Sequence, residues 1–132
     1  MNNQLTHIFI VGAGGAIGAI LRFKLSNLIT QNYLFYKFPN LPLNTFIINI
    51  LGCLFVGIIS GLILKYNNIS YELKIFCITG LAGGFTTFSA FCLENFNLIK
   101  TGNLYTVILY SLLSIILGIV CIFIGLYLTS KI

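Results

Sequence analysis

The sequence predicts an all-α membrane protein with four transmembrane helices, the third of them broken near its middle. Only 7% of the 132 residues are charged, whereas about a quarter are charged in a typical soluble domain, and 58% are hydrophobic. A helix that crosses a bilayer needs about 20 mostly apolar residues. The chain is therefore long enough for four spans and short connections, and we expect one transmembrane domain over residues 1–132.

The first two spans are predicted at residues 8–29 and 43–64. The preceding stretch MNNQLTH has neither the basic flank nor the small-residue cleavage site of a signal peptide, so we expect the first helix to be retained. Arg22 and Lys24 lie near the end of this span, and a loop that contains Lys37 and both prolines separates it from the second. The sequence KYNN closes the second span.

The third and fourth spans are predicted at residues 73–99 and 104–128. In the third, Gly83 and Gly84 interrupt the apolar run, and the sequence FTTFSAF follows them at once. A helix break at membrane depth survives only where it is buried in protein or lines a wet cavity, because the freed backbone groups need hydrogen-bond partners. The glycine pair therefore marks a candidate site. The alternative is that the two glycines only let another helix approach closely.

The basic residues give the chain no strong orientation bias. Four spans put both termini and the loop between the second and third spans on one side, which holds Lys65, Lys74 and Lys131. The opposite side holds Lys24, Lys37 and Lys100, with Arg22 as a fourth if it lies outside the hydrocarbon. Because basic residues in short loops set orientation, this near balance favours insertion both ways up and an antiparallel homodimer. The alternative is that one asymmetric loop fixes a single orientation.

Small residues four apart offer surfaces for close helix contact. Three such pairs occur: Gly14 with Gly18, Gly57 with Gly61, and Gly80 with Gly84. This spacing is common where membrane helices touch. Four helices packed together leave no continuous polar path, so a transport function for this chain would require an oligomer.

The broken third span is a candidate cation site. A half-helix that ends at the glycine pair presents carbonyl groups at its negative end. A second half that begins with Thr86 or Thr87 as N-cap directs amide groups toward the same point. Carbonyl oxygens favour hard cations, and broken helices in transporters hold sodium in this way.

Aromatic and hydroxyl side chains near the break predict an anion path. Phe88 and Phe91 lie on nearly the same helix face, and the positive edge of a phenyl ring can meet an anion without trapping it by a full charge. Two aromatics at this spacing are otherwise ordinary packing residues. Neutral polar groups also recur at steps of four in the second and fourth spans: Thr45 and Asn49, then Thr106, Tyr110 and Ser114. Each alone could form an ordinary hydrogen bond between helices, but together they indicate a path for an anion that is lined by neutral polar groups.

The missing residue types exclude several function classes. His7 is the one histidine, so the chain has no ligand cluster for a metal enzyme, and no span pairs a nucleophile with a base. We therefore predict that it is not an enzyme. Glu72 lies in a loop and Glu94 lies toward a membrane face, which leaves no carboxylate at mid-membrane for proton coupling.

The four cysteines form no CxxC pair and are interpreted as packing thiols. The basic residues are too dispersed for a nucleic-acid surface.

Three stretches of the chain resemble the signature sequences of the Fluc (CrcB) fluoride channel family. They are GAGGAIGAILRF at 12–23, LNTFIINILGCLFVG at 43–57 and GLAGGFTTFSAFCLE at 80–94. The resemblance covers nearly the whole chain in order, although the fourth helix matches through its polar spacing alone. Two positions depart from the family pattern: Asn44 stands where the family usually has glycine, and Ala90 where it often has threonine.

The resemblance implies an antiparallel, dual-topology homodimer in the bacterial inner membrane, with two fluoride pores and a central structural sodium ion that is not transported. By motif, the sodium ligands would be the backbone carbonyls of Gly83 and Thr86. The pore would be lined by Phe88, Phe91, Asn49, Ser114, Tyr110, Thr87, Ser89 and Thr45. Arg22 and Glu94 would lie at a vestibule.

The predicted function is passive export of fluoride through a selective channel. Hydrogen fluoride crosses a bilayer uncharged and ionises in a near-neutral cytoplasm, and the interior-negative potential then favours exit of the anion by about 2.3 kcal/mol per 100 mV. One alternative is a small proton-coupled multidrug exporter, which would need a carboxylate in the first span, where residues 8–29 have none. A second is a membrane assembly subunit without transport.

Overall fold

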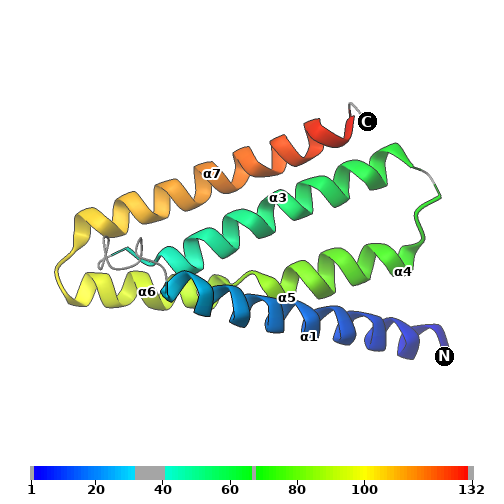
Figure 1. The fold of residues 1–132 in the computed structure, drawn as a ribbon, viewed down its shortest axis with the longest axis horizontal. Helices are drawn as coiled ribbons and strands as arrows, with labels where there is room; N and C mark the ends of the chain where they lie inside the picture. Colours follow the sequence, from blue (N-terminus) through cyan, green and yellow to red (C-terminus); the bar gives the residue numbers. More distant parts are fainter. Residues whose placement is uncertain (1, 32–40, 67, 131–132) are drawn as a thin grey trace.

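The computed structural model describes residues 2–31, 41–66 and 68–130, and every regular element among them is helical (Figure 1). As predicted, the described residues contain four helical stretches long and apolar enough to cross a membrane. Three of them correspond to single long helices: α1 (Asn2–Thr30), α3 (Leu43–Lys65) and α7 (Leu104–Ser130). The third stretch is composite, and its parts are α4 (Tyr71–Lys74), η1 (Ile75–Ala82), α5 (Gly83–Phe85) and α6 (Phe88–Lys100). Some residues used in the sequence analysis lie outside the described residues. They are Pro39, in the predicted loop, and the basic residues Lys37 and Lys131.

Local sequence signals explain where these helices begin and end. The Ser70 side chain caps α4 by accepting a hydrogen bond from the Leu73 amide, 3.2 Å away. Between α6 and α7 the chain reverses at Gly102, whose φ of 77° lies in the left-handed region that glycine adopts without strain. The Gly102 and Asn103 amides donate back to carbonyls of the last turn of α6, so the end of that helix is satisfied.

The helices pack in two pairs that lie side by side. In Figure 1, α3 runs along α7, and α1 runs along η1 and α5, while α6 turns toward the beginning of α7. α1 begins and α7 ends at the same end of the bundle (Figure 1). This arrangement agrees with an even number of membrane crossings.

The predicted small-residue pairs mediate contacts within the chain. A Cβ atom on Gly14 would lie 2.6 Å from the Phe76 carbonyl oxygen, and one on Gly80 would lie 2.9 Å from the Val11 carbonyl oxygen. The α1 and η1 backbones therefore touch. On the other pair, a Cβ atom on Gly57 would lie 2.9 Å from Ile122 Cα, so α3 and α7 are held together in the same way.

Substitution of Gly14 by alanine is expected to lower the free energy of unfolding by about 1–3 kcal/mol, the usual cost of overpacking a tight contact. Gly12→Ala is the matched control on the same helix, because a Cβ atom there meets nothing within 4 Å. Detergent-denaturant titration of the purified variants measures the difference. Equal stability of the two variants would show that the α1–η1 contact can widen without cost.

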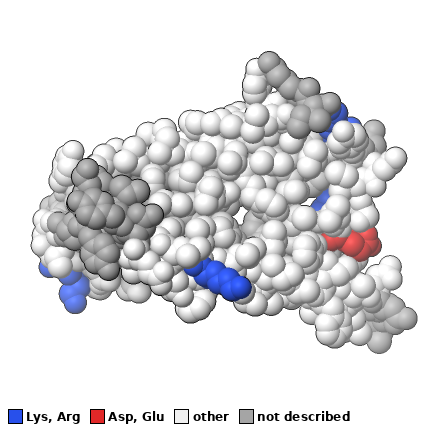
Figure 2. Space-filling model, in the orientation of Figure 1, with Lys and Arg blue, Asp and Glu red and all other residues white. Residues whose placement is uncertain are grey.

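The chain shields few side chains by itself. Among the described residues, the buried apolar side chains are Ile48, Cys77, Ala82, Leu98 and Tyr110. Large apolar side chains are instead exposed along every long helix, and the face in Figure 2 is almost entirely uncharged. An apolar surface of this extent is suited to lipid or to another protein rather than to water.

The prediction that Gly83 and Gly84 break the third span is wrong in its position. Both glycines lie in the short α-helix α5, and the helix is interrupted two residues later, at Thr86 and Thr87. Gly84 is required for another reason: a Cβ atom there would lie 2.9 Å from Gly15 Cα on α1. For Gly84, the alternative of close helix approach is therefore correct. The π-helical conformation of η1 was not predicted from the sequence.

Candidate functional site

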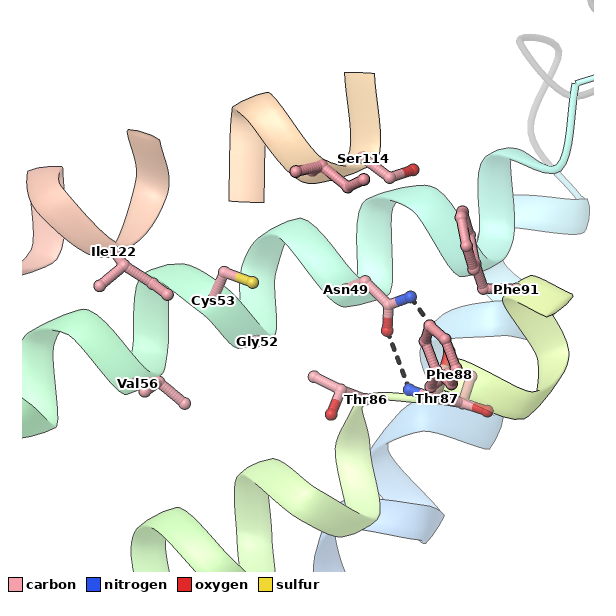
Figure 3. A pocket seen from close by; sticks show the side chains of 11 residues that line it. Asn49, Gly52, Cys53, Val56, Thr86, Thr87, Phe88, Phe91, Ser114 and Ile122 are labelled. Carbon is pink, nitrogen blue, oxygen red and sulfur yellow. Dashed lines mark hydrogen bonds between the residues drawn. The ribbon is translucent and has the colours of Figure 1, made fainter. Parts of the chain in front are cut away.

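The third span changes direction at Thr86 and Thr87, where the backbone is extended (Figure 3). Thr86 has φ −82° and ψ 162°, and Thr87 has φ −150° and ψ 116°. α6 begins at the next residue, and the Thr87 hydroxyl accepts a hydrogen bond from the Ala90 amide at 3.2 Å. Of the two threonines proposed as N-cap, Thr87 performs this role.

The side chain of Asn49 on α3 binds both backbone groups of Thr87 at the break. Its amide nitrogen donates to the Thr87 carbonyl oxygen at 3.2 Å, and its amide oxygen accepts from the Thr87 backbone N–H at 2.9 Å (Figure 3). Both backbone groups of the extended residue are thereby paired. A part-buried amide that forms both bonds provides what an interrupted helix requires in an apolar environment.

Gly52, one turn beyond Asn49, completes the seat for the break. The Thr86 methyl group packs against Gly52, and a Cβ atom at this position would overlap with it. Sequence reasoning did not identify Gly52 as part of the site. The available signal was its spacing, because residues three apart on a helix share a face.

A cleft with a volume of about 350 Å³ lies between α3, α6, α7 and the break. Its lining residues are Asn49, Gly52, Cys53, Val56, Thr86, Thr87, Phe88, Phe91, Ser114, Ile115 and Ile122 (Figure 3). Among the described residues, no charged side chain belongs to this lining. The cleft is polar near Asn49 and Ser114 and apolar toward Val56 and Ile122.

The two phenylalanines share the face predicted for them, and both line the cleft. Their ring centroids are 5.9 Å apart, with an interplanar angle of 28°. Phe88 is 78% exposed in the single chain, so its ring contributes little to the packing of that chain. Exposed phenylalanine at a cleft wall indicates a role other than core packing.

Ser114 on α7 lines this cleft and carries an unpaired polar atom. Its hydroxyl oxygen is buried and has no hydrogen-bond partner within the described structure. Buried hydroxyl groups are normally paired. The Ser114 hydroxyl therefore keeps an unused hydrogen-bonding capacity beside the cleft.

Thr45 and Tyr110 do not line the cleft but pair with Glu94 behind Phe91. The Thr45 hydroxyl donates to Glu94 Oε1 at 2.5 Å, and the Tyr110 hydroxyl donates to Oε2 at 2.8 Å. The Tyr110 ring also packs on Phe91 with centroids 5.0 Å apart. Glu94 was expected at a vestibule, whereas in the single chain it joins α3, α6 and α7 through these bonds.

The remaining predicted residues lie at the edge of the cleft or away from it. The Ser89 hydroxyl is exposed and lies 3.2 Å from the Thr87 hydroxyl. Arg22 is half-buried on α1, and neither Arg22 nor Thr106 belongs to the cleft lining. Cys53, interpreted as a packing thiol, also lines the cleft.

The carbonyls of Gly83 and Thr86 have lost the donors that a continuous helix would give them. The Thr87 amide, which would reach back to Gly83, donates to Asn49. The Ala90 amide, which would reach back to Thr86, donates to the Thr87 hydroxyl. Two carbonyl oxygens near a helix break fit the ligand chemistry of a hard cation such as sodium.

Comparison with known proteins finds a matching family and several similar relatives. The profile of the family described as "CrcB-like protein, Camphor Resistance (CrcB)" matches residues 9–126. A relative from Azobacteroides pseudotrichonymphae is 51% identical over 127 residues, covering 96% of this chain and 98% of the relative. One from Methylobacillus flagellatus is 42% identical over 89% of this chain and 90% of its own length. One from Flavobacterium psychrophilum is 40% identical over 94% and 97%. All three are named "Fluoride-specific ion channel FluC".

Proposed function

The chain belongs to the CrcB family, and from this premise we propose that it is a fluoride-specific ion channel through which fluoride leaves the cytoplasm passively. The observation that carries the proposal is the uncharged cleft beside the break in the third span, where hydrogen-bond donors and phenyl rings meet. The FluC relatives match over nearly the full length of this chain.

The lining offers fluoride neutral partners in place of water. The Ser114 hydroxyl is unpaired, and the Asn49 amide retains a second N–H after one is used on Thr87. The edges of the Phe88 and Phe91 rings add weak positive potential along the same wall. Selectivity then follows from replacing the hydration shell of a small anion, while the absence of a full positive charge in the cleft lets the ion leave.

Glu94 acts through its neighbours in this mechanism. It binds the Tyr110 hydroxyl, and the Tyr110 ring supports Phe91 from behind. The Thr45 hydroxyl holds the other carboxylate oxygen. We infer that these three residues fix the position of the Phe91 ring edge.

We infer further that the working unit is an antiparallel homodimer of dual topology. The cleft is open in the single chain, and the exposed ring of Phe88 needs a cover. An inverted second copy would provide that cover and double the number of pores. Epitope tags on both termini, probed from each side of an intact inner membrane, test this: both tags must be detected on both sides.

A sodium ion between two such copies would pair with the carbonyls of Gly83 and Thr86, whose helical donors are diverted to Asn49 and to the Thr87 side chain. When bound, this ion would supply positive charge that holds the two breaks together. We propose that it is structural and is not transported. Replacement of sodium by a large organic cation during purification should then lower the midpoint of thermal unfolding.

Fluoride efflux from liposomes tests the proposed function. Vesicles loaded with potassium fluoride and reconstituted with the protein should release fluoride to an electrode only after valinomycin provides a path for potassium. Chloride-loaded vesicles should release little. A proton-coupled exporter would instead require a pH gradient, and a non-transporting subunit would give no protein-dependent flux. Either result would remove the channel proposal.

A further inference from the structure

A second hollow, distant in sequence from the break, lies between the last turns of α3 and α7. Its volume is about 570 Å³, and its lining is Gly61, Leu64, Lys65, Phe123, Leu126 and Tyr127. We call it the α3–α7 groove. It has no residue in common with the cleft of the proposed channel, so it is a separate site.

The walls of the groove are large apolar side chains that open outward. Leu64 is 77% exposed, Phe123 is 66% exposed and Tyr127 is 58% exposed. The floor adds no free polar group. Thr129 packs against Gly61, and its hydroxyl donates to the Gly125 and Leu126 carbonyls of its own helix. A groove of this kind suits a hydrocarbon chain.

Lys65 gives one end of the groove a positive charge. It is the last residue of α3 and the one charged member of the groove lining among the described residues. Its ammonium nitrogen lies 5.5 Å from the centre of the Tyr66 ring, a cation–π contact at the rim. Within the described residues Lys65 forms no ion pair, since the pair recorded there joins His7 and Glu72.

The position of the groove along the membrane normal agrees with its apolar walls and its one basic side chain. It occupies the last turns of a membrane-spanning helix pair, where acyl chains meet headgroups, and lysine at a helix end reaches the headgroup level. We propose that the α3–α7 groove binds an anionic phospholipid, with an acyl chain along Leu64 and Phe123 and the phosphate beside Lys65. The proposal goes beyond ion conduction and does not depend on it.

Tryptophan fluorescence tests the proposal, because the chain contains no tryptophan. Phe123→Trp introduces a single indole into the groove wall. The protein is reconstituted in phosphatidylcholine vesicles that contain either brominated phosphatidylglycerol or brominated phosphatidylcholine, and quenching gives the relative association of the two lipids. We expect about fivefold preference for phosphatidylglycerol, the factor for one basic side chain at an anionic headgroup. Lys65→Gln in the same background should abolish the preference.

A matched control exists on α1, outside the groove. Phe9 is 76% exposed and does not line the groove. Phe9→Trp should show less than half of the preference seen at the groove, and Lys65→Gln should not change it. Equal preference at both positions, or a preference that survives Lys65→Gln, would overturn the proposal. So would an indole at the groove that neither brominated lipid quenches, the result expected if a second copy of the chain covers it.

Discussion

Phe88→Ile is expected to reduce fluoride efflux about 100-fold, because the ring edge at the open wall of the cleft is replaced by an aliphatic group. A hydrogen bond to a charged group contributes about 1.5–3 kcal/mol, a value taken here for a ring edge that contacts a desolvated anion, and each 1.4 kcal/mol is a factor of ten. The substitution keeps an apolar side chain of similar size. Liposome efflux after valinomycin measures the rate.

The same variant should fold normally. Phe88 is 78% exposed in the single chain, so its ring supplies little packing energy there. Phe96→Ile is the control: it makes the same change on the same helix, outside the cleft, and should conduct like the parent. An unchanged rate in Phe88→Ile would show that the ring edge does not contact the ion.

Asn49→Ala is expected to be the most destabilising single change in the site. It leaves both the N–H and the carbonyl of Thr87 without the partners that Asn49 supplies. An unpaired buried polar group costs about 1–3 kcal/mol, so the free energy of unfolding should fall by roughly 2–6 kcal/mol for the two groups. Fluoride efflux should be lost with it, because the break and the cleft share this amide.

Denaturant titration in micelles, with circular dichroism as the readout, measures this loss. Asn97→Ala on the exposed face of α6 is the control and should be nearly neutral. If Asn49→Ala unfolds at the parent midpoint, the clamp does not hold the break.

The number of spans could be predicted from the sequence because hydropathy and length alone determine it. The position of the break could not. Glycine propensity is a local property and pointed to Gly83 and Gly84, whereas the break is held by Asn49, which is 38 positions away from Thr87 in the chain. The glycines instead serve the α1 contact, which is also a tertiary effect.

Helical periodicity gave the shared face of Phe88 and Phe91, because both lie on one regular helix. It could not show which neighbour each polar residue would meet. Tyr110 and Ser114 are four apart on α7, yet Tyr110 reaches Glu94 and Ser114 lines the cleft. Spacing defines a direction around a helix axis, but the packing of the neighbouring helices decides the contact.

The small shielded interior has a consequence for how such a chain behaves when it is diluted in a bilayer. With so few apolar side chains enclosed by its own fold, the proposed homodimer would supply much of the native state's advantage, and association obeys mass action. The ratio of lipid to protein then becomes a thermodynamic variable. Stabilities measured at one reconstitution density will not transfer to another.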